Sequence, residues 1–295
     1  MIRHIVLFFS WVVIGSGADF VPEVGPEVQR ITVSCGDVSV LFRGASQWTP
    51  GRLDYKETPM TTERSAYGTV FNFPEVGFIG TAHFENEAED LKSVRFFIDG
   101  EYLESPEATL NGETFRLERR SKIRAFNLEN VTEIHNNRIV ETTTISTDEE
   151  VPLKLVYHFM HAWSTEVSAY LAVDESSPEK PYRGVLNDTN ELERNFFINR
   201  SVDWVAVYHK ASGQFAVSRL LQKPREIASP SKIWNVPGAY RKYYLTAFQN
   251  QTVPAGFKGT WKMVTAFGSA SPDSWEMAAE TVAKELTKPP LSPPN

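Results

Sequence analysis

The sequence predicts an all-β protein, a sandwich or barrel of antiparallel strands with a single helix at the C-terminus. About a dozen short segments alternate apolar and polar residues or are rich in aromatic and β-branched ones, and Gly, Pro or Asn stands between them. No helical pattern separates these segments before the end of the chain. Strands that follow one another without intervening helices are typical of a sandwich or a barrel.

A hairpin opens the series, because VQRITVSCGDVSVLF at 28–42 alternates about a turn at Gly36-Asp37. A second pair of strands is predicted at 68–73 and 77–83. The remaining predicted strands are 93–98, 114–125, 131–135, 138–146, 153–160, 203–209, 214–220, 240–248 and 258–267. One of them carries charged residues at every second position, and the face that they share is expected to meet water. These residues are Arg116, Glu118, Arg120, Lys122 and Arg124.

One helix is predicted near the C-terminus, where Asp273 and Glu276 have the spacing of a capping box. The apolar residues on its predicted inner face are Trp275, Ala279, Val282 and Leu286. Such a face is expected to pack across the outside of a sheet. Residues 288–295, KPPLSPPN, are predicted to be a disordered tail, because their four prolines can neither extend a helix nor join a sheet. The polar segment 174–195 is predicted to be a long loop.

The N-terminus is typical of a signal peptide at residues 1–18. A positively charged start precedes an apolar run at 5–14, which is short for a membrane span, and small residues follow up to Ala18. The alternative is an uncleaved anchor helix. Cleavage would leave a mature domain at 19–287 with no stable membrane anchor, exported to the periplasm or the extracellular space.

Composition narrows the classes of function. The chain has 37 acidic and 30 basic residues, a formal charge of −7 and no long basic cluster, so nucleic acid is a poor candidate partner. Cys35 is the only cysteine and reads as a buried small hydrophobe, so stability must come from a large core rather than from disulfides. No motif predicts a cofactor, and nothing in the sequence indicates the oligomeric state.

The most informative segment is 138–163, RIVETTTISTDEEVPLKLVYHFMHAW, which ends with His158 and His161 among aromatic residues. A histidine can give or take a proton near neutral pH. Two histidines three positions apart point to opposite faces of a regular strand. Both could line one site only if the strand ends or bulges near Met160.

This segment resembles the part of the galactose mutarotase (aldose 1-epimerase) superfamily in which an apolar strand ends in a histidine followed by aromatics. Three other segments are similar to the family: the closing YYLTAFQNQTVPAGFKGTWKMVTAF, His83 in GFIGTAHFENEAED, and Arg52 in GRLDY. The resemblance implies a large antiparallel supersandwich whose concave sheet binds a sugar. It also implies that His158 takes the place of the acid histidine, His83 that of the earlier histidine, and Arg52 that of a sugar-contacting arginine.

One departure from the family concerns the reaction. In the mutarotases a glutamate on the penultimate strand takes the proton from the anomeric hydroxyl, whereas here Thr246 or its neighbours stand in that position. We therefore expect an exported carbohydrate-binding or carbohydrate-active protein that acts on a sugar or a uronic-acid-containing glycan. Its chemistry would be lyase or epimerase-type proton transfer. The alternatives are a non-catalytic carbohydrate-binding module and a structural envelope protein.

The candidate catalytic residues are His158, His83 and His161, all at predicted strand ends and expected to share one cleft. The candidate substrate-binding residues are Arg52, Trp163, Tyr157 and Glu166. Trp163, Trp204, Trp234 and Tyr240 could stack on sugar rings or fill the core. Arg52 could clamp a carboxylate or lie in a solvated loop. No metal site is predicted, because zinc would need His83 or Glu166 to join the two neighbouring histidines.

Overall fold

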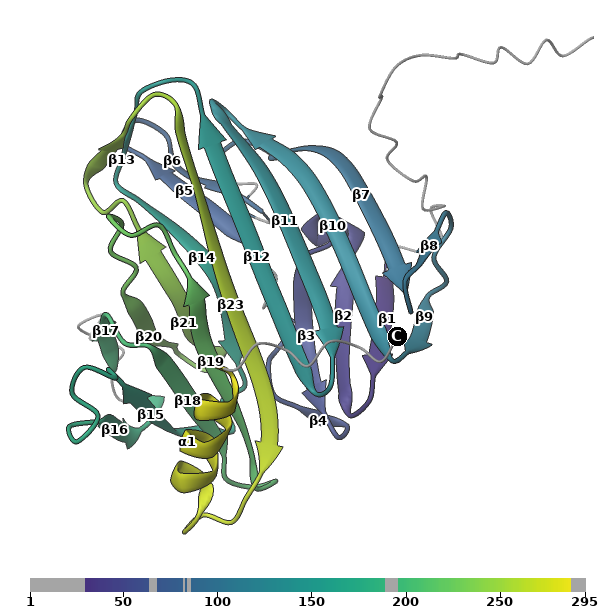
Figure 1. Ribbon diagram of the computed structural model, residues 1–295, viewed down its shortest axis with the longest axis vertical. Coiled ribbons are helices and arrows are strands. Elements are labelled where there is room, and N and C mark those ends of the chain that lie inside the picture. The colour runs from purple at the N-terminus through teal and green to yellow at the C-terminus, as the bar shows by residue number, and fades with distance from the viewer. Residues whose placement is uncertain (1–29, 64–67, 82, 84–85, 189–195, 288–295) are drawn as a thin grey trace, which may run out of the picture.

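The computed structural model describes residues 30–63, 68–81, 83, 86–188 and 196–287, which form 23 strands and one α-helix (Figure 1). The predicted signal peptide at 1–18 and the predicted tail at 288–295 lie outside these residues. The predicted all-β sandwich with a C-terminal helix is confirmed. Among the described residues no helix is long and apolar enough to cross a membrane.

The largest sheet has ten strands in the order β16-β15-β18-β19-β23-β12-β11-β10-β7-β8. Its strands are β7 (Asp90–Ile98), β8 (Glu101–Leu103), β10 (Thr114–Ile123), β11 (Phe126–His135), β12 (Arg138–Thr147), β15 (Val167–Val173), β16 (Tyr182–Val185), β18 (Trp204–His209), β19 (Gln214–Gln222) and β23 (Phe257–Ser269). Every pairing within this sheet is antiparallel.

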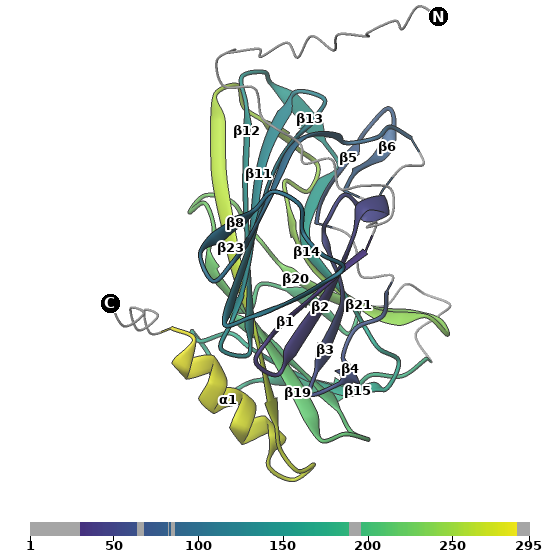
Figure 2. The same cartoon turned by 90° about the vertical axis from the view of Figure 1, so that its right-hand side faces the viewer.

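Two smaller sheets form the second layer, seen beside the ten-stranded sheet in Figure 2. The six-stranded sheet, in the order β17-β20-β21-β14-β5-β6, consists of β5 (Thr69–Phe73), β6 (Gly77–Gly80), β14 (Leu155–Trp163), β17 (Ile198–Arg200), β20 (Ser231–Val236) and β21 (Tyr240–Ala247). The five-stranded sheet consists of β1 (Arg30–Cys35), β2 (Val38–Arg43), β3 (Pro50–Tyr55), β4 (Thr58–Pro59) and β9 (Thr109–Gly112). A short pair joins β13 (Val151–Leu153) to β22 (Gln251–Val253).

The core lies between the two layers, where inward-facing residues of both alternate with outward-facing ones. In β1 the buried positions are Ile31, Val33 and Cys35, with the period of two that the sequence shows. Across the layers Phe71 of β5 stacks on Phe126 of β11 with ring centroids 4.4 Å apart. Each such buried aromatic side chain contributes roughly 1.5–3 kcal/mol.

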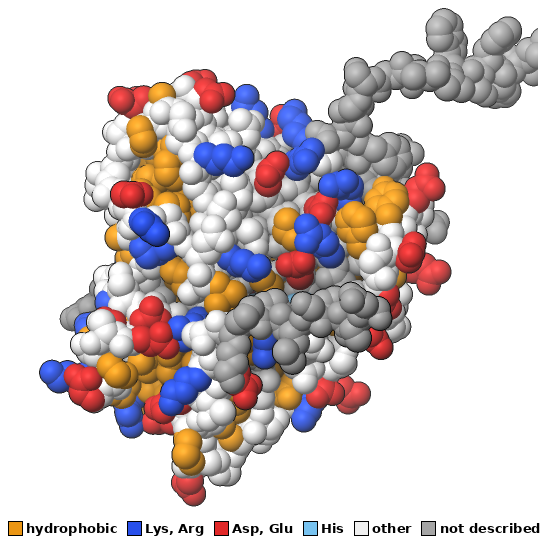
Figure 3. All heavy atoms as spheres, in the orientation of Figure 1, with side chains coloured by type: hydrophobic (Ala, Val, Ile, Leu, Met, Phe, Trp, Pro, Cys, Tyr) orange, Lys and Arg blue, Asp and Glu red, His pale blue; other side chains and the backbone are white. Residues whose placement is uncertain are grey.

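The outer face of the ten-stranded sheet meets water on one half and the helix on the other. The alternating charged residues of β10 lie on the solvent side, as predicted, and Figure 3 shows positive and negative side chains mixed over this face. Arg116 pairs there with Glu118 at 2.8 Å and with Glu133 at 2.7 Å. Exposed pairs of this kind contribute about 0–1 kcal/mol each.

The single α-helix, α1 (Trp275–Glu285), packs on the outside of the ten-stranded sheet, as predicted. Its Trp275 stacks on Tyr208 of β18 at 5.0 Å. The predicted capping box is wrong, because the helix begins one residue later, with Ser274 as N-cap and no side-chain capping bond. The helix is therefore held by its apolar face rather than by its first turn.

The predicted hairpin at 28–42 and the long alternating strands are confirmed. Several strands were not predicted, among them β3, β15, β16 and β20. The strand β16 lies inside the segment predicted to be a loop, and its residues are largely exposed, so they show no core-facing period. The strand β20 runs up to the Asn235 to Gly238 turn, whose turn residues hide it in the sequence.

Candidate functional site

The strand β14 lies between β5 and β21 and contains a β-bulge at its centre. Its pairing with β21 shifts register between His158 and His161, and Phe159 adopts a left-handed φ of 55°. A non-glycine residue in this region costs on the order of 1–3 kcal/mol and must be held there by its surroundings. Because the bulge inserts one residue, both histidines face the interior of the sandwich, while Tyr157 and Met160 face outward.

The outward side of β14 carries Tyr157, which is hydrogen-bonded to His83 with 2.5 Å between the hydroxyl oxygen and Nε2. Phe78 of β6 stacks on the His83 ring at 5.6 Å, and Tyr244 of β21 lies 5.2 Å from the Tyr157 ring. Histidine and tyrosine in contact can pass a proton between them and to a bound ligand. Within the described part of the chain, His83 and Tyr157 are the only two predicted site residues that contact each other on the outer face.

Lys242 of β21 lies among three aromatic rings on the same face. Its Nζ is 4.8 Å from the centroid of Tyr157, 5.1 Å from that of Tyr244 and 5.7 Å from that of Trp234. An ammonium over aromatic faces is attracted by about 0.5–2 kcal/mol. Burial lowers the pKa of Lys242 to about 8, and burial raises the pKa of Tyr244 to about 12, opposed in part by Trp234. The surface is thus rich in rings and holds a lysine whose pKa burial lowers to about 8.

We call this surface the outer aromatic face. It consists of Phe78, His83, Tyr157, Trp234, Lys242 and Tyr244. The flat rings of such a surface can stack on the apolar C–H face of a sugar, and the polar tips of Tyr, Trp, His and Lys can bond its hydroxyls.

On the inner side of the same sheet, His158 is completely buried. Its ring packs on Trp261 of β23 at 4.6 Å, and Nδ1 donates to the Thr69 hydroxyl at 3.2 Å. Burial lowers its pKa from the ordinary 6.5 to about 3. A neutral histidine enclosed in this way has no path for proton exchange with a ligand on the outer face.

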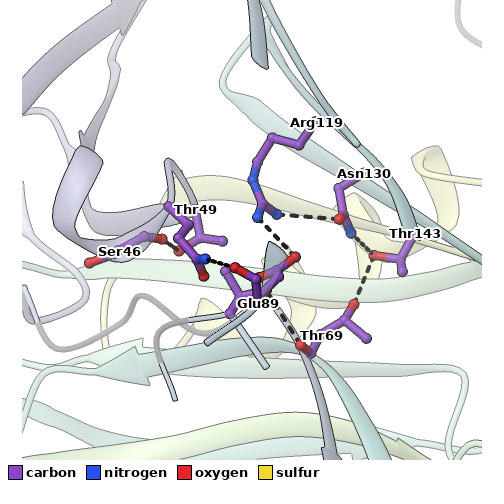
Figure 4. A network of polar contacts seen from close by, with 9 residues as sticks. Ser46, Thr49, Thr69, Glu89, Arg119, Asn130 and Thr143 are labelled. Atoms are coloured by element: carbon purple, nitrogen blue, oxygen red, sulfur yellow. Dashed lines mark hydrogen bonds and ion pairs between the residues drawn. The ribbon is translucent and has the colours of Figure 1, made fainter. Parts of the chain in front are cut away.

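Thr69 is the end of a polar network that crosses the interior, shown in Figure 4. Thr69 donates to Thr143 at 3.3 Å, Asn130 donates to Thr143 at 2.8 Å, and Arg119 donates to Asn130 at 3.3 Å. The guanidinium of Arg119 also pairs with Glu89 at 3.1 Å, and the two side chains are only 3% and 0% exposed. Breaking such a buried ion pair is costly, because one charge is left without its partner.

His161 lies beside this network and donates from Nε2 to the carboxylate of Glu141 at 2.8 Å. Both residues are buried. A cavity of about 20 Å³ borders Arg119, Asn130, Glu141 and Thr143, with room for about one water molecule. The inner polar layer is therefore closely packed and too small to admit a sugar ring.

The structure brings His83 and Tyr157 together and separates them from His158 and His161. The expectation that the three histidines share one cleft is wrong, because successive residues of β14 point to opposite faces of the sheet. Trp163 is also in the core, where its ring edge meets His161 at 5.2 Å.

Two predicted substrate-binding residues lie elsewhere. Arg52, on β3 of the five-stranded sheet, pairs with Asp54 at 2.7 Å. Glu166 is exposed in the turn between β14 and β15. Among the described residues no group of three or more His, Cys, Asp or Glu side chains is placed to hold a metal ion.

Sequence reasoning named Trp234 as a stacking candidate but missed Phe78, Lys242 and Tyr244. The alternation Tyr240, Lys242, Tyr244 in β21 was the available signal, since every second residue of a strand shares a face. In the position expected for the family's glutamate, the Thr246 hydroxyl donates to the Pro230 carbonyl at 3.4 Å.

No protein family model matches the chain, and no curated protein matches it either. Solved structures do. A structural genomics target from Synechocystis is 9% identical, with a TM-score of 0.51 over 87% of this chain and 99% of that one. The galactosidase domain of an alpha-galactosidase-sucrose kinase is 9% identical, with a TM-score of 0.51 over 84% of this chain. This chain spans 42% of the length of that domain.

A candidate aldose 1-epimerase from Escherichia coli K12 is also similar, at 10% identity and a TM-score of 0.46, with 82% of this chain and 99% of that one covered. Mutarotase-related proteins are among the solved structures that this chain is similar to, as the sequence predicted. At these identities the likeness concerns the fold alone. What the chain does must be argued from its own side chains.

Proposed function

We propose that this protein binds carbohydrate on the outer aromatic face. The observation that carries the proposal is the ring of Tyr157, Trp234 and Tyr244 about Lys242, with the hydrogen-bonded His83 beside it. Of these rings Tyr157 is buried, while Trp234 and Tyr244 are partly exposed. Partly exposed aromatic rings next to hydrogen-bonding tips suit a ligand with apolar ring faces and hydroxyl edges. The sharing of this fold with a galactosidase domain supports the same class of ligand.

Two forms of this function remain distinct. In the catalytic form, the Tyr157 and His83 pair moves a proton to or from the bound sugar in lyase or epimerase-type chemistry. In the non-catalytic form, the same face binds without reaction. Thr246 favours the second form, because its hydroxyl is engaged with the backbone and cannot act as the general base that a carboxylate would provide.

Export is part of the proposal. The charged start and the apolar run of residues 1–18 support a signal peptide, and periplasmic or extracellular glycans are the ligands such a protein would meet. N-terminal sequencing of secreted material should begin at Ala18 or Asp19. Mature protein that keeps Met1 would contradict it.

The binding test is isothermal titration of the purified protein with a panel of oligosaccharides, read together with the ultraviolet absorbance of unsaturated products. Trp234→Ala should weaken binding by about tenfold, the loss of one aromatic contact of roughly 1.4 kcal/mol. The matched control is Tyr102→Ala, because Tyr102 is an aromatic residue 45% exposed on β8 of the other layer. Unaltered binding by Trp234→Ala would exclude the outer aromatic face.

A further inference from the structure

A cavity of about 310 Å³ lies at one end of the ten-stranded sheet, where β15 and β19 end and β18 begins. Its lining shares no residue with the outer aromatic face. Small-molecule sites have volumes of about 300–1,000 Å³, so this cavity suits one compact ligand. Its polar lining residues are Asp174, Ser201, Asp203, Gln222, Lys223 and Ser229.

Two carboxylates form one wall of the cavity. Asp174 directly follows β15, and Asp203 directly precedes β18. In the pairing of these strands Val173 stands opposite Trp204, so the two aspartates leave neighbouring strands at the same end. Neighbouring strands are about 5 Å apart, and two carboxylates at such a separation disfavour each other's charge. A cation bound between them relieves this repulsion.

Hydrogen bonds hold both carboxylates in position. The backbone N–H of Glu175 donates to Asp203 Oδ2 at 2.7 Å. The hydroxyl and the backbone N–H of Ser176 donate to Asp174 Oδ1 at 2.6 and 2.9 Å. These two bonds lower the pKa of Asp174, which favours its charged form. Because an ionised carboxylate has about four acceptor sites, each aspartate can accept further bonds from a ligand.

The other charged groups beside this wall are engaged. Glu175 pairs with both terminal nitrogens of Arg219 at 2.7 Å. Lys223, the one basic residue of the lining, donates from Nζ to the carbonyl of Ile227 at 3.0 Å. The lining therefore carries two acidic groups and one basic group, a balance that favours a cationic ligand over an anionic one.

The rest of the lining adds neutral polar and apolar groups. Ser229 is only 4% exposed, and its Oγ accepts from Nε1 of Trp261 at 2.9 Å, so its own hydroxyl proton can be donated to a ligand. Gln222 offers both a donor and an acceptor at the rim. Val202 and Leu220 give an apolar surface. Such a mixture suits a compact molecule with hydroxyl groups and C–H faces.

We propose that this cavity is a second ligand site and that it takes one amino sugar unit, whose ammonium group lies between Asp174 and Asp203. The hydroxyls of the sugar bond Ser229 and Gln222, and its ring lies against Leu220. An ammonium group has three protons to donate, and its bonds to carboxylates are stronger than bonds between neutral groups. This site goes beyond the proposed function and does not depend on it.

The test compares ligands with the same pyranose ring. Glucosamine, glucose and N-acetylglucosamine are titrated calorimetrically into the mature protein at low salt, and they carry an ammonium, a hydroxyl and a neutral amide at one ring position. We expect glucosamine to bind about ten times more tightly than the other two. This advantage should shrink at high salt and at a pH that deprotonates the amine. Ethanolamine, an ammonium without the ring, should bind severalfold more weakly than glucosamine.

Variants assign the binding to the cavity. Asp174→Asn and Asp203→Asn each keep an oxygen that can accept the backbone bond but remove one charge. Each should weaken glucosamine binding about tenfold and leave the melting temperature nearly unchanged. The matched control is Asp90→Asn, because Asp90 is an exposed aspartate that pairs with Lys92 on β7, and it should bind glucosamine as the wild-type protein does.

Several results would overturn the inference. Equal affinity for glucosamine and glucose would refute the role of the ammonium group, and equal affinity for ethanolamine would refute the role of the ring. A preference for glucosamine that both aspartate variants keep would place its binding outside the cavity. If no ligand of the series binds, the cavity is not an amino sugar site, while oligosaccharide binding on the outer aromatic face is tested separately by Trp234→Ala. If one aspartate variant fails to fold, the other decides.

Discussion

The two sides of β14 differ more than any other neighbouring regions of the molecule. On the outer side Tyr157 meets His83 and a group of partly exposed rings. On the inner side its neighbour His158 is packed against Trp261 and bonded to Thr69. The difference teaches that residue type alone does not indicate a role, because two adjacent residues with titratable side chains have opposite surroundings.

The inner side is a polar layer inside an apolar sandwich. Hydrogen bonds and one ion pair link side chains from both layers, including Thr69 of β5 and Arg119 of β10. We infer that this layer fixes the way the sheets pack, since each polar group must find its partner before the core can close. On the outer side, by contrast, the hydrogen bond of Tyr157 to His83 joins side chains of the same layer.

The largest effect that separates the two sides is on stability. Arg119→Ala should lower the free energy of unfolding by roughly 3–5 kcal/mol, because Glu89 is then buried without its counter-charge. Urea unfolding measures this loss. Arg95→Ala, which breaks an exposed pair with Glu118, is the matched control and should cost less than about 1 kcal/mol. Similar losses for both variants would contradict the buried role of the pair.

The next effect is a pH dependence that belongs to the inner side. The pKa of His158 is near 3 in the folded protein and near 6.5 when unfolded, so between these values only the unfolded chain takes up the proton. Stability from this group is complete above about pH 6.5 and falls by up to roughly 1.4 kcal/mol for each pH unit below it. Urea unfolding at pH 7.5 and 5.5 should show the loss.

His158→Gln removes the titrating group and keeps a polar side chain at this position. The variant should be less stable than the wild-type protein at pH 7.5, and the gap between them should narrow at pH 5.5. Ligand binding at pH 7.5 should be retained. A gap that stays constant with pH would mean that His158 is not the group that titrates.

A smaller effect is expected on the outer side, and on binding rather than on stability. Tyr244→Ala should weaken carbohydrate binding by about tenfold, or roughly 1.4 kcal/mol, because it removes a stacking ring beside Lys242. Titration and a thermal melt on the same preparation measure both properties. If the melting temperature falls as far as that of Arg119→Ala while binding is retained, Tyr244 stabilises the fold and does not contact the ligand.

The smallest effect concerns Arg52, whose sequence position resembles that of a sugar-contacting arginine. Its side chain is 39% exposed and paired with Asp54 on the same strand. Arg52→Ala should change stability by less than about 1 kcal/mol and leave carbohydrate affinity within twofold. A tenfold loss of affinity would extend the ligand-binding surface to the five-stranded sheet.

The fold was predictable because long strands such as β10, β11 and β12 show their period of two in the sequence. The face on which a residue lies was predictable only where that period is unbroken. The bulge at Phe159 has no sequence signal. The sequence could therefore predict that His158 and His161 face the same side only if the strand bulges or ends between them. The meeting of His83 with Tyr157 depends on the pairing of β6 with β5 and of β5 with β14, which no local pattern encodes.

The bulge at Phe159 also limits how roles can be transferred from distant relatives. A relative whose strand lacks the extra residue would match this chain in phase before position 159 and out of phase after it. Aligned residues on the two sides of the bulge therefore require separate registers. Deletion of the extra residue at the bulge would turn the side chains between the bulge and Trp163 to the opposite face of β14. A ligand would then meet different side chains there, although the order of the strands would not change.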